Sequence, residues 1–462
     1  MTTAACSHAR KPAQGTETIR VEAEDGKLNG VEVSTEEKGF SGRGYVTGFD
    51  NDADSLEMRF QAKAGLHEMR IAAFLPGGKK GFQYELNGEK GDGMMNDEGP
   101  GLRTSVVGRF PLKEGENVII IRKGWGWYDL DYLEFEPTQP VPLLKVSKKL
   151  SDPAADPCAK RLMSFLVDNY GKKMLSGEQE LHMAEYAHSM TGKWPAVVNG
   201  DFMDYSPSRR ERGADPTGKT EKYIAWAEKG GIFGASWHWN APADLIDKKD
   251  NEWWRGFYSD GTTFDFAAAL ADPSSTRYAL LLRDIDAIAV ELKKLRDAGV
   301  PVLWRPLHEV NGEWFWWGTK GPDSFRKLYR LLHERMTGTH GLHNLIWVYS
   351  PIPGRIYDDW YPGDDVVDIV GVDIYTDQSS GMGGQWDEAM RGYNGRKLVT
   401  LSESGTLALP EKARDQGVWW SWFSVWEGGF TRKIPKDLFK RVYDDPDVLT
   451  LDELPNLSKY PE

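Results

Sequence analysis

From Thr18 to about Pro137, short segments alternate between apolar and polar residues, and Gly, Asn and Asp separate one segment from the next. Alternation with a period of two is typical of strands that bury one face, and frequent turn residues are typical of a β-sandwich. The pattern therefore predicts an all-β domain over residues 18–137. The predicted strands include Ile19–Glu24, Ser55–Phe60, His67–Ala73 and Asn117–Arg122.

The pattern changes after this domain. Thr138-Gln-Pro-Val-Pro142 holds two prolines in five residues, which predicts a short stiff linker over residues 138–148. From residue 149 to residue 462, apolar runs that read as buried strands alternate with helical or loop segments. The eight predicted strands cover residues 173–177, 195–199, 231–237, 302–307, 344–349, 368–374, 398–402 and 419–426.

Eight strands separated by helical segments predict an α/β fold of the (β/α)8 barrel type, the TIM barrel. Arg277–Ala298 is the clearest helix, because its apolar residues recur every three or four positions and Gly299 follows it. A second helix is predicted over Ser324–Met336. A doubly wound open sheet is the alternative, although no Gly-rich phosphate-binding turn follows the first predicted strand.

The composition narrows the class of partner. A chain of 462 residues with 40% apolar residues is long enough for two or three domains. The net charge of −13 argues against a nucleic-acid partner, which would require a basic face, and leaves a neutral polymer or a small molecule. No apolar run approaches the roughly 20 residues of a membrane span. Nothing indicates an oligomer, so a monomer is the default expectation.

The first 17 residues are predicted to be a disordered leader. Two cysteines, Cys6 and Cys158, are too few for a disulfide framework or a cysteine-based zinc site. Thr3-Ala-Ala-Cys6 is similar to the end of a lipoprotein cleavage site, which predicts a secreted or cell-surface protein with lipid on Cys6. A leader with an incidental cysteine is the alternative.

Candidate chemistry gathers where the predicted barrel strands end. The carboxyl ends of barrel strands carry the catalytic residues in this fold. Glu309 follows the fourth strand and Glu403 the seventh, so two carboxylates are expected to face one cavity. Two carboxylates across a cavity are what glycoside hydrolysis requires. A structural ion pair between Glu309 and Arg305 is the alternative. The other candidates at strand ends are Asp201, Asp204, His238, Asn240, His308, Asp373, Tyr375 and Trp426.

The segment that contains Glu309 also carries a resemblance. Trp304-Arg-Pro-Leu-His-Glu-Val-Asn-Gly-Glu-Trp-Phe-Trp-Trp-Gly318 closely resembles the acid/base motif of glycoside hydrolase family 26, and Ser402-Glu-Ser-Gly405 resembles its nucleophile motif. Ser236-Trp-His-Trp-Asn240 and Val372-Asp-Ile-Tyr375 extend the match over roughly residues 150–440. Most members of this family are retaining β-1,4-mannanases that need no cofactor for catalysis.

The resemblance implies roles for individual residues. Glu309 becomes the general acid/base, Glu403 the nucleophile, and Tyr375 the residue that orients the nucleophile. The implied substrate-binding residues, which would contact β-mannan or manno-oligosaccharide, are His238, Trp239, His308, Trp314, Tyr375 and Trp426. We expect Phe315, Trp316 and Trp317 to form an apolar wall that keeps Glu309 protonated.

The N-terminal domain carries a second resemblance. Val21-Glu-Ala-Glu-Asp-Gly26, Gly44-Tyr-Val-Thr-Gly-Phe-Asp50, Leu86-Asn-Gly88, Gly115-Glu-Asn-Val-Ile-Ile-Ile121 and Gly124-Trp-Gly-Trp-Tyr-Asp-Leu-Asp-Tyr-Leu-Glu134 together resemble a family 35 carbohydrate-binding module. The resemblance implies a jelly-roll sandwich with a structural calcium held by Glu22, Glu24 and Asp131. It also implies a sugar site in the loops at one end, with Trp125 and Tyr45 as stacking candidates. For Trp127, a place in the core is equally expected.

Several other functions stay open. The related activities are an exo-acting mannobiohydrolase, a β-1,3-xylanase and a mixed-linkage glucanase, and loops such as residues 377–387 would decide between an open and a blocked cleft. A polysaccharide-binding protein without catalysis belongs to another class. A metal-dependent hydrolase with His238, His308 and aspartates as ligands is a third, although no His-x-Glu-x-x-His spacing supports it.

Overall fold

The computed structural model describes residues 17–95, 99–354, 359–376 and 379–462. These residues form two compact units, which divide between Pro140 and Val141. Cys6 and almost all of the predicted leader lie outside the described residues. Within the described ranges, no helix is long and apolar enough to cross a membrane.

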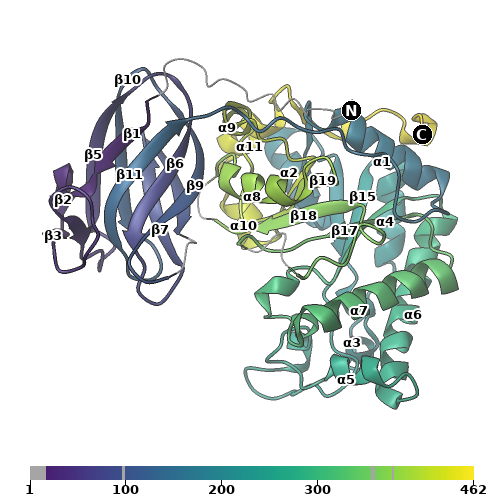
Figure 1. Ribbon diagram of the computed structural model, residues 1–462. Coiled ribbons are helices and arrows are strands. Elements are labelled where there is room, and N and C mark those ends of the chain that lie inside the picture. The colour runs from purple at the N-terminus through teal and green to yellow at the C-terminus, as the bar shows by residue number, and fades with distance from the viewer. Residues whose placement is uncertain (1–16, 96–98, 355–358, 377–378) are drawn as a thin grey trace, which may run out of the picture. The chain divides into compact units, whose positions relative to one another are not determined.

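Unit 1 is a sandwich of two antiparallel sheets (purple and blue in Figure 1). One sheet has the order β3-β4-β11-β6-β9, with β1 paired to β11, and the other has the order β2-β5-β10-β7-β8. The strands are β1 (Ile19–Glu22), β2 (Lys27–Asn29), β3 (Glu32–Ser34), β4 (Tyr45–Thr47), β5 (Ser55–Ala62), β6 (Gly65–Phe74), β7 (Lys80–Leu86), β8 (Glu89–Met95), β9 (Leu102–Leu112), β10 (Gly115–Lys123) and β11 (Asp129–Pro137).

The period-two pattern explains how these sheets pack. In β5, Leu56, Met58 and Phe60 are buried, whereas the residues between them are more exposed. The ring of Phe60 stacks at 4.5 Å on that of Phe135, which belongs to β11 in the other sheet. Alternate residues of each strand thus build a core between the sheets.

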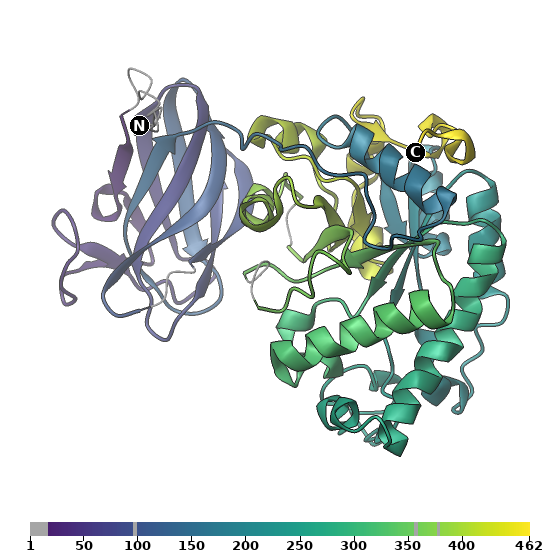
Figure 2. The same ribbon diagram turned by 45° about the vertical axis from the view of Figure 1, so that its right-hand side comes forward.

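Unit 2 contains the predicted (β/α)8 barrel. Its eight parallel strands close in sequence order and lie at the centre of the unit, with the helices outside (Figure 2). The strands are β13 (Gly177–Gln179), β14 (Val197–Asp201), β15 (Ile232–Trp237), β16 (Val302–Pro306), β17 (Leu345–Tyr349), β18 (Ile369–Ile374), β19 (Leu398–Ser404) and β20 (Phe423–Val425).

The first predicted strand differs from the observed one. Residues 173–177 were expected to form one barrel strand, but Met174–Leu175 (β12) pairs instead with Val448–Leu449 (β21). Ser176 separates the two pieces, and its N–H donates to the carbonyl of Leu449. The barrel strand therefore begins at Gly177.

The helices follow the apolar periodicity closely. α6 spans Thr276–Asp297, buries Leu281, Ile285, Ile288, Leu292 and Leu295, and is followed by Gly299 at a φ of 71°. The other helices are α1 (Pro157–Asn169), α2 (Leu181–Thr191), α3 (Pro207–Arg210), α4 (Lys219–Glu228), α5 (Phe266–Ala271), α7 (Gly321–Glu334), α8 (Gly383–Tyr393), α9 (Pro410–Gln416), α10 (Gly429–Lys433) and α11 (Lys436–Tyr443). A π-helical turn, Arg335–Thr339, extends α7.

Part of the segment predicted as a linker packs on the barrel unit. Val146 is buried in a cluster with residues of α1, and so is Leu150, which lies just after the predicted linker. The N–H of Leu144 donates to the side chain of Asn394 over 2.9 Å, and Asn394 donates to the carbonyl of Pro142 over 3.1 Å. These contacts attach the chain to unit 2 from Pro142 onward.

Candidate active site

The carboxyl ends of six barrel strands carry the polar and aromatic residues that the sequence singled out. β14 ends at Asp201, His238 follows β15, His308 and Glu309 follow β16, Tyr375 follows β18, Glu403 lies near the end of β19, and Trp426 follows β20. Because the strands are parallel and the barrel is closed, these ends meet at one face. Residues far apart in the sequence therefore share one site.

Glu403 is a buried carboxylate with one charged and one polar partner. It is only 3% exposed, and each of its oxygens accepts one hydrogen bond. Arg305 donates to Oε2 and the Tyr375 hydroxyl donates to Oε1, both over 2.5 Å. Arg305 also donates to Asp373 Oδ2 over 2.7 Å, so one buried guanidinium lies between two carboxylates. Glu403 is thus held as an ion-paired carboxylate with a fixed direction.

Irregular pairing of β19 brings Asp373 and Glu403 opposite each other. The register with β18 shifts between Val372 and Asp373, and the register with β20 shifts between Leu401 and Ser404. A shift of this kind changes the direction of the side chains that follow it. Burial raises the pKa of Asp373 to about 7, against the opposing effect of Arg305.

Glu309 is held in an uncommon backbone conformation. Its φ is 53° and its ψ is 28°, in the left-handed region that few residues other than glycine adopt. The N–H of Glu309 donates to the carbonyl of Ser350 over 2.7 Å, and the N–H of Gly312 donates to the carbonyl of Glu309 over 3.0 Å. These bonds keep the residue in place despite the strain.

The side chain of Glu309 has different partners from that of Glu403. It is 7% exposed, and Trp314 Nε1 donates to its Oε2 over 2.8 Å. Burial, and then the negative charges of Glu403 and Asp373, raise the pKa of Glu309 well above its usual range. Arg305 pairs with Glu403 and Asp373, so the predicted alternative of a structural Arg305–Glu309 pair is wrong. The arrangement suits Glu309 to carry a proton near neutral pH.

Two histidines form a buried chain next to Glu309. His238 Nδ1 hydrogen-bonds to Asp201 Oδ2, and the Nε2 atoms of His238 and His308 lie 3.0 Å apart. Burial, followed by the charge of Arg305, lowers the pKa of His308 well below its usual range. His308 is therefore neutral, and Asp201 orients His238.

Two aromatic residues border this site, Trp314 with an exposed ring and Trp426 with a half-buried one. Trp314 is 39% exposed and bonded to Glu309. The ring of Trp426 lies 5.7 Å from that of His238, and the N–H of Trp426 donates to the carbonyl of Ser404 over 2.8 Å. Both rings can stack on a sugar within reach of the two carboxylates.

The aromatic run after Trp314 is buried. Phe315, Trp316 and Trp317 are 4%, 1% and 0% exposed. The Phe315 ring lies 5.1 Å from that of His308, and Trp317 Nε1 donates to the carbonyl of His308 over 2.9 Å. Phe315 and Trp317 thus contact His308, the residue that precedes Glu309.

In unit 1, two tryptophans project from the loop between β10 and β11. Trp125 is 58% exposed and Trp127 is 70% exposed. The Trp125 ring lies over Gly81, where an added Cβ would come within 2.4 Å of Nε1. Gly81 therefore allows the ring to lie against the backbone. Trp127 belongs to the surface and not to the core.

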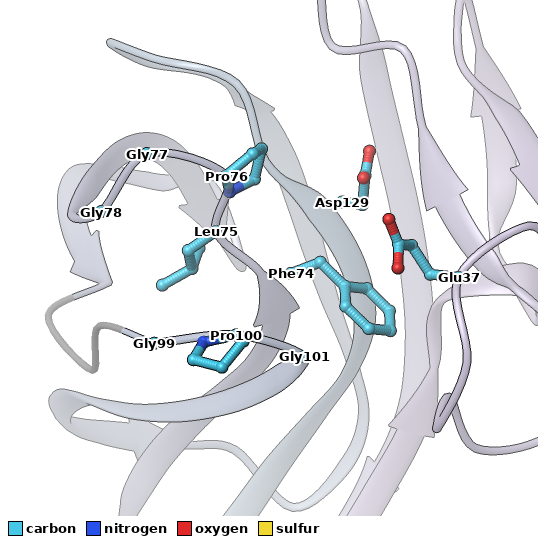
Figure 3. A pocket seen from close by; sticks show the side chains of 10 residues that line it. All are labelled: Glu37, Phe74, Leu75, Pro76, Gly77, Gly78, Gly99, Pro100, Gly101 and Asp129. Carbon is cyan, nitrogen blue, oxygen red and sulfur yellow. The ribbon is translucent and has the colours of Figure 1, made fainter.

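A cavity of about 490 Å³ opens at the same end of the sandwich (Figure 3). Phe74 of β6 lies opposite Asp129 of β11 in the sheet, which places the cavity where both strands meet the loops. The carboxylates of Glu37 and Asp129 lie close together on one side of it. Burial, together with the charge of Glu37, raises the pKa of Asp129. The lining residues are Glu37, Phe74, Leu75, Pro76, Gly77, Gly78, Gly99, Pro100, Gly101 and Asp129.

Comparison with known proteins decides the family. Residues 151–453 match the model of glycosyl hydrolase family 26, and residues 19–138 match that of carbohydrate binding module family 35. The chain belongs to glycosyl hydrolase family 26. The family match covers the barrel that holds Glu309 and Glu403, and the module match covers the sandwich.

Relatives of this family 26 chain share its two-part organisation. A mannan endo-1,4-beta-mannosidase of Thermothelomyces thermophilus is 43% identical over 95% of this chain and 91% of that protein. A mannan endo-1,4-beta-mannosidase A of Piromyces is 35% identical over 95% of this chain and 73% of that protein. The crystal structure of a Podospora anserina GH26-CBM35 beta-(1,4)-mannanase has a TM-score of 0.70 and 42% identity, covering 95% of this chain and 99% of that chain.

The structure corrects two of the predicted sugar contacts of this family 26 chain. Trp239 is 0% exposed, stacks on Trp237 at 4.2 Å, and donates from Nε1 to Asp284 over 2.9 Å, so it belongs to the core. Tyr45 is 3% exposed, and its ring packs 5.1 Å from that of Phe74. Neither ring has a face free to stack on a sugar.

Some connections in the family 26 site had no sequence prediction. Asp373 and Asp201 were recognised at strand ends, but their partners Arg305 and His238 were not assigned to them. Ser350, which holds the backbone of Glu309 and donates from its hydroxyl to Asp373 over 2.6 Å, was not singled out. Its position directly after β17 was the available signal, since the other site residues also lie at the ends of strands or shortly after them.

The predicted calcium ligands gather around one loop. Asp131 accepts from the N–H of Ser41 over 2.9 Å, and Glu24 accepts from the N–H of Arg43 over 2.7 Å, while Glu22 accepts from the Ser41 hydroxyl. Glu24 Oε2 is buried without a hydrogen-bond partner. Burial raises the pKa of Asp131 to about 6, and the negative charges of Glu22 and Glu24 act in the same direction. An unpaired buried carboxylate oxygen fits a hard cation.

The present side-chain positions limit that fit. Among the residues the structure describes, no group of three or more His, Cys, Asp or Glu side chains is arranged to hold a metal ion. Calcium binding would therefore require Glu22, Glu24 and Asp131 to turn toward a common point. The metal-dependent alternative meets the same difficulty. The Nε2 atoms of His238 and His308 contact each other and do not face a common metal position.

Proposed function

We propose that this chain is a retaining endo-β-1,4-mannanase that hydrolyses mannan and galactomannan by double displacement. The observation that carries the proposal is the asymmetry of its two buried carboxylates: Arg305 pairs with Glu403, whereas Glu309 accepts from a neutral indole. A retaining glycosidase needs one ionised carboxylate and one protonated carboxyl group. The family 26 match and the mannanase relatives supply the substrate class.

In the first step, Glu309 donates its proton to the glycosidic oxygen as the bond to the anomeric carbon breaks. Glu403 Oε1 or Oε2 attacks that carbon and forms a glycosyl ester, while the leaving sugar departs with the proton. Tyr375 and Arg305 hold the Glu403 carboxylate in its attacking orientation through their two hydrogen bonds. No metal or organic cofactor is required.

In the second step, Glu309 acts as the base. Esterification removes the negative charge of Glu403, which is one of the causes that raise the pKa of Glu309. The pKa of Glu309 therefore falls in the intermediate, and its carboxylate can take a proton from water as the oxygen attacks the anomeric carbon. The ester breaks, and both glutamates return to their starting states.

The residues around the pair would position the mannan chain. Trp314 and Trp426 offer rings on which sugars stack. His238 and His308 would hydrogen-bond a sugar from their Nε2 atoms by giving up the contact between these two atoms. The described residues of one chain hold every proposed contact. We therefore propose a monomer as the active form.

We propose that the sandwich binds β-mannan through Trp125, with Trp127 and the cavity of Figure 3 beside it. Exposed tryptophans next to polar groups are suited to sugar rings. We also propose a structural calcium between Glu22, Glu24 and Asp131, supported by the unpaired oxygen of Glu24.

A polysaccharide substrate favours a secreted or cell-surface location, because such a polymer does not cross a membrane unaided. Lipid on Cys6 would anchor the protein there. Mass spectrometry of the N-terminal peptide from the native host would test this proposal. A mass equal to that of the unmodified peptide would show that Cys6 carries no lipid.

The function is tested by products and by variants. We expect the purified protein to release a mixture of manno-oligosaccharides from linear mannan, and mannobiose as the sole product would indicate an exo-enzyme instead. Glu403→Ala should retain less than about a hundredth of the wild-type rate while still binding mannohexaose, as expected for loss of a nucleophile. The matched control is Glu313→Gln, a change of an exposed carboxylate four residues after Glu309.

A Glu403→Ala variant with more than that residual rate would overturn the nucleophile assignment. Absence of hydrolysis by the wild-type protein, with mannan binding retained, would favour the non-catalytic alternative. Faster hydrolysis of β-1,3-xylan or mixed-linkage glucan than of mannan would move the substrate class within the family.

A further inference from the structure

A third buried glutamate lies outside the catalytic pair. Glu178 belongs to β13 and is 0% exposed. The hydroxyl of Tyr443 in α11 donates to Glu178 Oε1 over 2.9 Å, and the hydroxyl oxygen of Thr431 in α10 lies 3.4 Å from Oε2. Neither of the two proposed catalytic steps uses this residue.

The hydrogen bonds of Thr431 indicate which oxygen carries a proton. Thr431 Oγ1 lies 2.7 Å from the carbonyl oxygen of Trp426. A carbonyl oxygen only accepts, so the single hydroxyl hydrogen of Thr431 goes to Trp426. The hydrogen in the Thr431–Glu178 contact must then come from Glu178. Glu178 fits this site as a protonated carboxylic acid.

The surroundings agree with a neutral Glu178. Burial raises the pKa of Glu178 to about 8. Three charged or titratable side chains on the neighbouring helices have partners other than Glu178. His182 of α2 pairs with Glu427, and Arg441 of α11 pairs with Glu411. Arg432 of α10 lies over the Tyr186 ring. The remaining charged residues of α10 and α11 are exposed, namely Lys433, Lys436, Asp437 and Lys440, and so is Glu185 of α2. The ring of His188 in α2 stacks on that of Trp194 at 4.3 Å.

One further titratable group faces Glu178. Burial, followed by the charge of Glu178, raises the pKa of Tyr443 well above its usual range. Tyr443 therefore keeps its proton wherever Glu178 titrates. Any change near pH 8 in this contact comes from Glu178.

Thr431 connects Glu178 to a proposed sugar contact. Trp426 is held at both ends of its peptide, by its N–H on Ser404 and by its carbonyl on Thr431. Its ring lies beside His238. Loss of the second bond would leave the Trp426 ring free to move within the site.

We propose that Glu178 is a positioning residue that acts in its protonated form: it donates to Thr431, whose hydroxyl fixes the backbone of Trp426. This inference rests on the proposed function, because it takes Trp426 to contact mannan. Ionisation of Glu178 turns its Oε2 into an acceptor that competes with the Trp426 carbonyl for the Thr431 hydrogen. Sugar binding then weakens as the pH rises.

The test measures binding, so that titration of the acid/base group does not obscure it. In the full-length Glu403→Ala protein, mannohexaose affinity is measured by calorimetry from pH 6 to pH 9.5. We expect the affinity to fall by about tenfold through pH 8, the size expected for one hydrogen bond. With Glu178→Gln added, the fall should disappear, because the amide donates to Thr431, accepts from Tyr443 and does not ionise.

Thr431→Val should weaken binding at every pH, and Thr431→Ser should restore it. A Glu178→Gln profile parallel to that of the parent, or normal binding by Thr431→Val, would overturn this inference alone. Absence of mannohexaose binding by the parent at pH 6 would overturn the proposed function, and this inference with it. If Glu178 had a purely structural role, Glu178→Gln would change the melting temperature of the protein, but the mannohexaose affinity would still depend on pH.

Discussion

Trp314 Nε1 donates a hydrogen bond to Glu309 Oε2 over 2.8 Å, which joins an exposed ring to the proposed acid. The same side chain can therefore contact a sugar and influence the proton of Glu309. This bond favours the ionised form of Glu309 and lowers its pKa, against the larger effect of burial.

Trp314→Phe should shift the pH profile toward the alkaline side. Without the indole N–H the pKa of Glu309 rises further, so the acid stays protonated to higher pH. The basic limb of kcat/KM should move up by about one pH unit, the size expected for one hydrogen bond to a carboxylate. Rates on manno-oligosaccharides from pH 5 to pH 10 would measure it. A basic limb that stays in place or moves down would show that the bond does not control the acid.

Arg305→Leu should destabilise the barrel and abolish hydrolysis. The change leaves Asp373 and Glu403 buried side by side without a cation. Removal of one partner from a buried pair costs about 3–5 kcal/mol. The free energy of unfolding of the barrel transition in denaturant would give the value.

The control for this change is Arg330→Leu, which breaks a half-exposed pair with Asp365. Exposed pairs contribute about 1 kcal/mol or less. If the free energy of unfolding fell equally in both variants, the buried pairs of Arg305 would not stabilise the site more than an exposed pair does.

Trp125→Ala should weaken mannan binding by the sandwich. In the Glu403→Ala background, which leaves the polymer intact, depletion from solution by insoluble mannan reports the affinity. We expect a loss of about tenfold, the size of one lost aromatic contact and its buried area. Val106→Ala, at an exposed apolar position of β9, is the control. If Trp125→Ala bound insoluble mannan as well as the Val106→Ala control, the sugar site would lie elsewhere on the sandwich.

Removal of calcium should lower the stability of the sandwich. A ligand that binds the folded form stabilises it, so a chelator should lower the melting temperature of this unit, and added calcium should restore it. Glu24→Gln should melt at the same temperature with and without the chelator, because its unpaired oxygen is the proposed ligand. If the chelator left the melting temperature of the wild-type sandwich unchanged, the proposed structural calcium would be wrong.

The sequence located the barrel and its two glutamates because both depend on local patterns. α6 follows from the spacing of its apolar residues, and Glu309 and Glu403 follow from their positions at the carboxyl ends of apolar strands. Trp239 shows where this reasoning was incomplete. Side chains alternate along an extended segment, so the two neighbours of the site residue His238 point to the opposite side, where Trp237 and Trp239 stack together.

Other features depend on tertiary contacts that no local pattern encodes. The register shifts of β19 bring Asp373 opposite Glu403, and only then can one arginine reach both. The burial of Tyr45 likewise depends on Phe74, which is distant in the sequence. The split of the first barrel strand depends on pairing with β21, near the end of the chain.

As the proposed nucleophile, Glu403 forms a covalent bond to the sugar. A 2-fluoro-mannoside with a good leaving group forms this ester but hydrolyses slowly, because the fluorine disfavours the positively charged transition state. Mass spectrometry of the intact protein and of its peptides would locate the label. We expect one fluoromannosyl group per chain, on the peptide that carries Glu403. A label on Glu309 or Asp373, or an unlabelled protein that still hydrolyses mannan, would contradict it.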